Sequence, residues 1–80
     1  MAWTKERIIA LNKLICEASG QPHAIRDEGT IDLACKHFKK LTRQRIEIIG
    51  CNIISENHPF VEGNKRTAAC IAVCMTLEGV

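Results

Sequence analysis

The sequence predicts an all-α fold, a small bundle of about four helices. Apolar residues recur at intervals of three and four in three stretches, and each stretch follows a threonine that can cap a helix. A fourth stretch, residues 68–77, is almost wholly apolar, which is typical of a helix in the middle of a domain. Helical spacing is lost over residues 21–29, which hold Pro22 and Gly29.

The first helix is predicted from a cap at Thr4 to about Ser19, with Gly20 as its stop. Trp3 precedes the cap and is expected to pack onto the first turn as a hydrophobic staple, with a contact to a partner as the alternative. This is a packing helix, and its apolar stripe consists of Ile8, Leu11, Ile15 and Ala18, widened by Leu14.

Residues 21–29 are predicted to form a loop or a short hairpin, in which His23 is expected to be exposed. The second helix then runs from a cap at Thr30 to about Leu41. Its buried face consists of Ile31, Ala34, Phe38 and Leu41.

The third helix is predicted over residues 43–57, capped by Thr42. Because β-branched residues are frequent in it, a strand over residues 46–54 stays open as an alternative. Gly50 costs a helix about 1 kcal/mol relative to Ala, so it is expected to mark close packing against another helix. The apolar stripe consists of Ile46, Ile49 and Ile53, broadened by Ile48 and Ile54.

Length and composition limit the possible classes of protein. Eighty residues predict one domain over residues 1–80, and a net charge of +2 is too weak to indicate direct nucleic-acid binding. No apolar run is long enough to span a membrane, and the first residues do not resemble a secretion signal, so we expect a cytoplasmic protein. The five cysteines are odd in number and lack a Cys-x-x-Cys pair, which favours reduced core thiols over disulfides or a zinc site.

The densest chemistry lies in residues 58–67, just before the apolar run. His58 can act as a general base near neutral pH, and the carboxylate of Glu62 suits Mg²⁺. Gly63 allows a tight turn before Asn64, which is a good helix cap. Phe60 can anchor the loop in the core. The pattern predicts a polar loop that leads onto the N-terminus of a buried helix, where free amides attract phosphate.

Two cations follow, Lys65 and Arg66, in the first turn of the expected helix. There they oppose the helix dipole, which costs about a few tenths of a kcal/mol unless an anion is bound. Arg can also grip phosphate oxygens with two hydrogen bonds. A polar turn before a buried helix needs a cap and a glycine whatever its function, but the unfavourable cations favour an anion site.

These residues resemble the signature of the Fic/Doc (Fido) family, His-x-Phe-x-Asp/Glu-Gly/Ala-Asn-Gly/Lys-Arg. The chain matches it at His58, Phe60, Glu62, Gly63, Asn64, Lys65 and Arg66. Lys65 followed by Arg66-Thr67-Ala68 is similar to the Doc (death-on-curing) branch, whereas the adenylylating Fic branch has a second Arg where this chain has Ala69.

The resemblance implies a transferase that moves a phosphate from ATP, or another nucleoside triphosphate, to a Ser, Thr or Tyr hydroxyl of a target protein. It further implies bound Mg²⁺ and the role of a toxin controlled by an antitoxin partner. His58 would be the base, Glu62 the metal ligand, and the phosphate-binding residues would be Gly63, Asn64, Lys65 and Arg66. The alternatives are a Fic-like adenylyltransferase, an inactive remnant that still binds a nucleotide or a partner, and a small structural protein in which the motif is only a cap.

A weaker resemblance covers residues 11–35, where the Doc-like flap holds a target peptide in extended form by strand addition. It would place Ile25, Arg26 and Asp27 in that flap. The chain is shorter than Doc-like domains and stops at Val80, so it is expected to be either a compact variant or a domain truncated at its C-terminus. Three helices are too few to cover the apolar fourth helix, which predicts a homo-oligomer.

Overall fold

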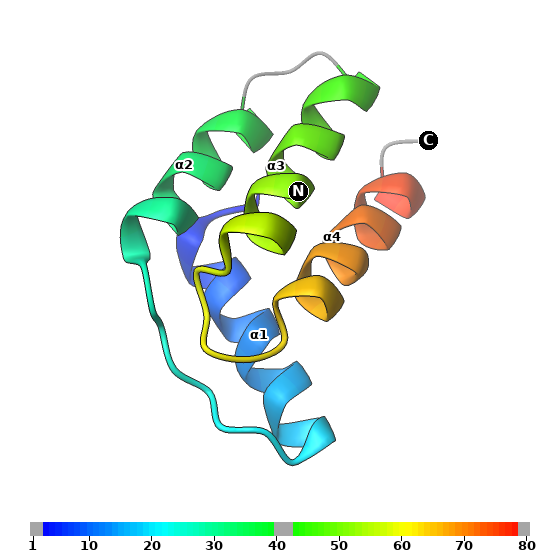
Figure 1. Ribbon diagram of the computed structural model, residues 1–80. Helices are drawn as coiled ribbons and strands as arrows, with labels where there is room; N and C mark the ends of the chain where they lie inside the picture. Colours follow the sequence, from blue (N-terminus) through cyan, green and yellow to red (C-terminus); the bar gives the residue numbers. More distant parts are fainter. Residues whose placement is uncertain (1–2, 40–42, 79–80) are drawn as a thin grey trace.

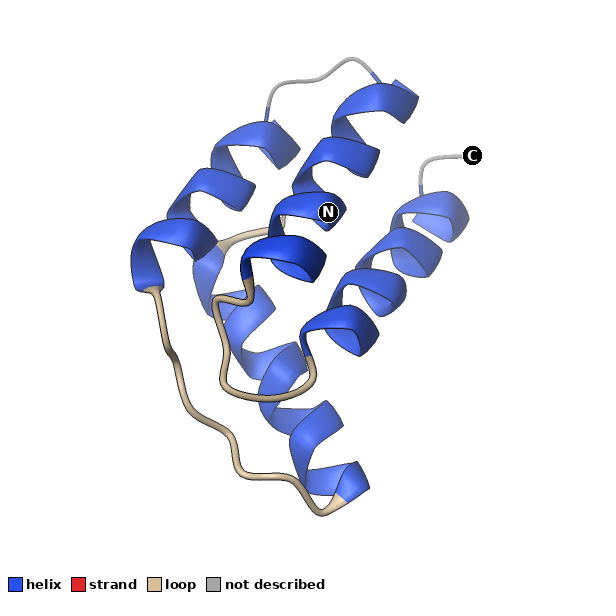
Figure 2. Cartoon of the chain, in the orientation of Figure 1, coloured by secondary structure: helices blue, strands red, loops and turns tan. Residues whose placement is uncertain are grey.

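The computed structural model describes residues 3–39 and 43–78, which form four helices and the loops between them (Figure 1). They are α1 (Lys5–Ser19), α2 (Glu28–Lys39), α3 (Arg43–Asn57) and α4 (Asn64–Glu78). The described residues contain no strand, only an isolated antiparallel bridge between Ile25 and Phe60 (Figure 2). The prediction of an all-α bundle of about four helices is therefore confirmed.

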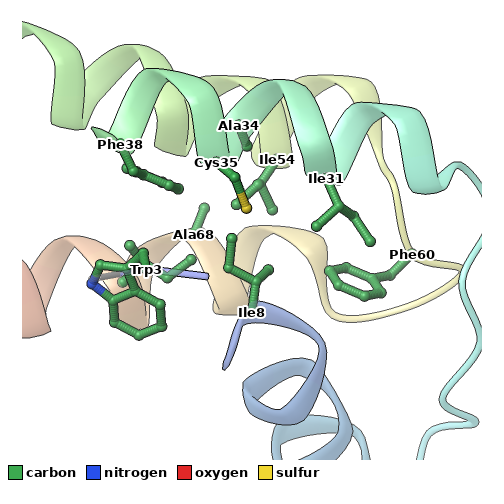
Figure 3. Packing of buried hydrophobic residues seen from close by; sticks show 10 residues of the cluster. Trp3, Ile8, Ile31, Ala34, Cys35, Phe38, Ile54, Phe60 and Ala68 are labelled. Carbon is green, nitrogen blue, oxygen red and sulfur yellow. The ribbon is translucent and has the colours of Figure 1, made fainter. Parts of the chain in front are cut away.

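The helices enclose one core. α3 packs against α2 on one side and against α4 on the other, while α1 contacts both α2 and α4 (Figure 1). Close up, the buried side chains form a continuous cluster that includes the aromatic rings of Trp3 and Phe60 (Figure 3). The members of the cluster are Trp3, Ile8, Ile31, Ala34, Cys35, Phe38, Ile54, Phe60, Ala68 and Ile71.

Both ends of α1 follow local chemistry. Thr4 accepts a hydrogen bond from the Arg7 N–H (3.2 Å), and Gly20 closes the helix in the left-handed conformation with φ 70°. Trp3 is buried within the core cluster, and the Arg7 guanidinium lies 4.0 Å from the centroid of its ring. The predicted cap and stop are confirmed, and the burial of Trp3 is in line with the predicted staple.

The predicted stripe of α1 is partly wrong. Leu14 is 64% exposed and Ala18 is also exposed, whereas the line that faces the core is Ile8, Asn12 and Cys16. A polar residue lies in the centre of this line because its hydrogen-bond partners come from distant segments, described below. Sequence periodicity does not register such partners.

α2 begins at Glu28, so the predicted cap at Thr30 is wrong. Asp27 takes that position, since its Oδ1 accepts from the Thr30 N–H (3.3 Å) and its Oδ2 accepts from the Thr30 hydroxyl (2.9 Å). The predicted buried residues Ile31, Ala34 and Phe38 are buried. The other residues of the prediction, Leu41 and the Thr42 cap of the next helix, lie outside the described residues.

α3 spans the predicted residues, which excludes the alternative of a strand over 46–54. Of its predicted stripe, Ile54 is fully buried and Ile53 packs against the core, whereas Ile49 is 43% exposed. The side chains of Ile46 and Ile48 lie outside the described part of the chain. A Cβ atom on Gly50 would lie 2.4 Å from Cε1 of Phe38 in α2. The predicted close helix packing at Gly50 is confirmed.

α4 is not the central helix that its composition predicts. One face is buried through Thr67, Ala68 and Ile71, but Val73 is 59% exposed and Leu77 is 75% exposed. The helix with neighbours on both sides is α3. No described helix combines the length and the apolar character needed to cross a membrane. None of the five cysteines forms a disulfide, and Cys16 and Cys35 are buried.

Candidate functional site

The loop that joins α3 to α4 turns on two residues with positive φ. His58 directly follows the end of α3 and adopts φ 50°, a left-handed conformation that His tolerates better than most side chains. Pro59 follows and cannot continue the helix. Gly63 adopts φ 77° just before α4. The loop is thus bounded by a helix stop at one end and a glycine turn at the other, with the His58 side chain exposed.

Phe60 and Asn64 fix the loop between these turns. The Phe60 side chain is fully buried in the core. Its backbone N–H donates to Asn64 Oδ1 (2.9 Å), and its carbonyl accepts from Asn64 Nδ2 (2.9 Å). The side chain of Asn64 therefore fastens the loop instead of capping α4, which corrects the sequence-based interpretation.

Gly63 is the residue that caps the N-terminus of α4. The Thr67 N–H donates to the Gly63 carbonyl (2.9 Å), which makes Gly63 the residue at the N-cap position. The amides of Asn64, Lys65 and Arg66 precede this first helical bond and stay outside the helix's own hydrogen-bond ladder. The side chain of Asn64 is buried and bonds to Phe60 at both ends of the amide, so the group that Asn64 offers a ligand is its backbone N–H.

An open hollow of about 400 Å³ lies over this helix end. It brings together His58, Glu62 and the three amides, and it is completed by Ser19 and Gln21 from the end of α1. The full lining is Ser19, Gln21, His58, Val61, Glu62, Gly63, Asn64, Lys65 and Arg66. Every predicted catalytic, metal-binding and phosphate-binding residue therefore borders one hollow, and the predicted anchor, Phe60, lies in the core instead.

The charges at the hollow favour an anion. Lys65 and Arg66 are exposed, and within the described residues neither forms an ion pair. Two cations and three amides at the positive end of the α4 dipole all attract negative charge. No group of three His, Cys, Asp or Glu side chains gathers among the described residues. Glu62 supplies the carboxylate in the lining of the hollow, so it is the residue there that could hold a metal ion.

The segment over residues 21–27 lies beside the loop, and it is not a hairpin. The Val61 N–H donates to the Ala24 carbonyl (3.0 Å), and the Arg26 N–H donates to the Pro59 carbonyl (2.7 Å). These bonds make Ile25 and Phe60 an antiparallel pair of the kind that does not share hydrogen bonds directly. The N–H and C=O of Ile25 therefore point away from the loop.

The three predicted flap residues do not line the hollow. Ile25 and Arg26 are exposed on this segment, and Asp27 caps α2.

Sequence reasoning missed Asn12, which is fully buried on α1. Its Nδ2 donates to the Glu62 carbonyl (2.9 Å) and to Thr67 Oγ1 (3.1 Å). Its Oδ1 lies 2.7 Å from Nδ1 of His23, which is half-buried and not exposed as predicted. The one signal for Asn12 in the sequence is its spacing of four from both Ile8 and Cys16, which makes it the polar member of a buried line.

Cys16 completes this cluster. Its thiol lies 3.6 Å from Asn12 Oδ1 and 3.7 Å from the Glu62 carbonyl. Burial raises the pKa of the Cys16 thiol, and the negative charge of Glu62 raises it further. The thiol therefore stays protonated at neutral pH, which makes it a weak hydrogen-bond donor and a poor nucleophile.

Comparisons with protein-family models, curated proteins and solved structures find no match for this chain.

Proposed function

We propose that the chain is a nucleotide-dependent transferase of the Doc kind, which moves a phosphate from a nucleoside triphosphate to a hydroxyl of a target protein. The observation that carries the proposal is the shared hollow. It is bordered by a histidine, a carboxylate, two cations and a helix N-terminus.

The phosphates would bind at the N-terminus of α4. The backbone amides of Asn64, Lys65 and Arg66 precede the helical ladder and are available to phosphate oxygens. Arg66 would add a fork of two N–H donors and Lys65 a point charge. The helix end would thus hold a nucleoside triphosphate by its most negative part.

His58 and Glu62 would serve the transfer itself. Glu62 would hold Mg²⁺, which when bound neutralises the charge of the phosphate oxygens. His58 would take the proton of the incoming hydroxyl while the oxygen of that hydroxyl bonds to the γ-phosphorus. The bond from that phosphorus to the β–γ bridging oxygen breaks, and the nucleoside diphosphate leaves with the electron pair.

Lys65 and Ala69 favour phosphate transfer over adenylylation, because the adenylylating branch carries a second Arg where this chain has Ala69. The remaining parts of the proposal follow from the same resemblance. They are a target with a Ser, Thr or Tyr hydroxyl and an antitoxin as controlling partner.

The test is incubation of the purified protein with Mg²⁺ and cell extract, in parallel with γ-labelled and α-labelled ATP. Transfer of the γ label to protein is the expected result. Transfer of the α label would show an adenylyltransferase. Mg²⁺-dependent ATP binding without transfer of either label would show an inactive binding remnant, and no binding at all would contradict the proposal.

A further inference from the structure

A buried amide side chain lies directly beneath the candidate site. Asn12 is fully buried, yet each end of its amide has polar neighbours. Two of these, Glu62 and Thr67, are 50 and 55 positions away in the sequence, so they meet Asn12 only in the folded chain. A buried polar cluster that is fully satisfied makes the arrangement around it rigid and specific.

The orientation of this amide is fixed by its neighbours. The Glu62 carbonyl can only accept a hydrogen bond, so the NH₂ group of Asn12 must face it. Oδ1 then faces Nδ1 of His23, which must carry a proton for the 2.7 Å contact to be a hydrogen bond. Asn12 thus holds the peptide group of Glu62 with one end and the side chain of His23 with the other.

His23 belongs to the segment 21–27, which also bonds through its main chain to the site loop at Pro59 and Val61. The His23 ring lies 6.1 Å from the ring of Phe60, centroid to centroid. A displacement of this segment would therefore shift Glu62 through two connections, the backbone hydrogen bonds and the side chain of Asn12.

We propose that Asn12 is a positioning residue that holds the peptide group of Glu62 and, through His23, couples the segment 21–27 to the nucleotide site. The coupling rests on the function proposed above, whereas the hold on the loop does not. Asn12 itself is buried and does not border the hollow, so it acts through Glu62 and contacts no substrate.

The test compares Asn12→Leu and Asn12→Asp with the matched control Asn52→Asp, which makes the same chemical change at an exposed position of α3. Leu keeps a similar volume but loses both ends of the amide. Asp keeps an acceptor for His23 but no longer donates to Glu62. The first measurement is hydrogen exchange at the N–H groups of Val61 and Arg26, which bond across the segment and the loop. Exchange should be faster in both Asn12 variants and unchanged in the control.

The second measurement is the Mg²⁺ concentration that gives half-maximal ATP binding. Loss of a group that orients a metal ligand typically costs 10–100-fold in metal affinity, so we expect an increase of about that size. Saturating Mg²⁺ should then restore ATP binding. A purely structural role would lower the folded fraction without shifting this midpoint.

An unchanged midpoint and unchanged exchange in folded Asn12→Leu would overturn the inference. If the Asn12 variants fail to fold, His23→Ala and Thr67→Val decide it by the same two measurements, since each removes one neighbour of the amide. If the wild-type protein binds no Mg²⁺-ATP, the proposed function and the coupling fail together. In that case the hydrogen-exchange comparison alone tests whether Asn12 holds the loop.

Discussion

At the scale of single residues, the backbone and the side chain of one residue have different roles around the hollow. Asn64 holds the Phe60 backbone with its side chain and leaves its N–H for a ligand. His58 combines a left-handed backbone at the end of α3 with a side chain that borders the hollow. Substitutions at His58 consequently have both a conformational and a chemical effect, which matched variants can separate.

His58→Ala should abolish transfer while leaving nucleotide affinity nearly unchanged, since removing a general base typically costs 10²–10⁴-fold in rate. The control is His58→Asn, because Asn tolerates positive φ and lacks the base. Both variants should lose transfer, and Ala should also lose stability to urea because it tolerates the left-handed backbone less well. Wild-type turnover in either variant would show that His58 is only the residue that ends α3.

Arg66→Ala should weaken nucleotide binding more than Arg66→Lys, because Lys keeps the charge and loses the two-pronged geometry. Isothermal titration with Mg²⁺-ATP measures both affinities. Equal losses from the two substitutions would instead indicate that the guanidinium contributes by packing.

At the scale of helices and loops, predictions from the sequence succeed where the cause is local. Thr4 and Gly20 bound α1 as predicted because each interacts with backbone within four residues of itself. The predicted start of α2 is wrong because two side chains three residues apart can cap the helix, and Asp27 is the cap in place of Thr30. The burial of Asn12 could not be read from local spacing, because its partners in the site loop and α4 are distant in sequence.

Gly50→Ala should destabilise the protein, although Ala favours helices by about 1 kcal/mol over Gly. The new Cβ would lie 2.4 Å from Phe38 Cε1, and overpacking of this kind typically costs about 1–3 kcal/mol. Urea denaturation measures the change in the free energy of unfolding. The double variant Gly50→Ala, Phe38→Leu should lose less than the sum of the two single losses. Strict additivity would show that the ring is not what Gly50 accommodates.

At the scale of the whole molecule, one face of α4 is apolar and has no covering helix among the described residues. Ala69, Ala72, Val73 and Leu77 are exposed on it, and none of them carries a charge. The four helices therefore enclose the core around α3 but leave apolar surface uncovered on the outer side of α4. Such surface commonly marks an interface.

We predict that this face forms a homodimer, seen as a species larger than the monomer in sedimentation at low micromolar concentration. Val73→Lys should shift the protein to monomer, because it places a charge in the contact. Leu14→Lys makes the same kind of change on α1, at a side chain that is 64% exposed, and should have no effect. A well-folded wild-type monomer under these conditions would contradict the prediction.

The N-terminus of α4 is the part of the chain that we propose binds the phosphates of a nucleotide. The most direct measurement is a titration of ¹⁵N-labelled protein with Mg²⁺-ATP, followed by amide chemical shifts. We expect the largest shifts at Gly63, Asn64, Lys65 and Arg66, and smaller shifts when Glu62 is replaced by Gln. If saturating Mg²⁺-ATP leaves these four amides unmoved, the phosphates do not bind at this helix end.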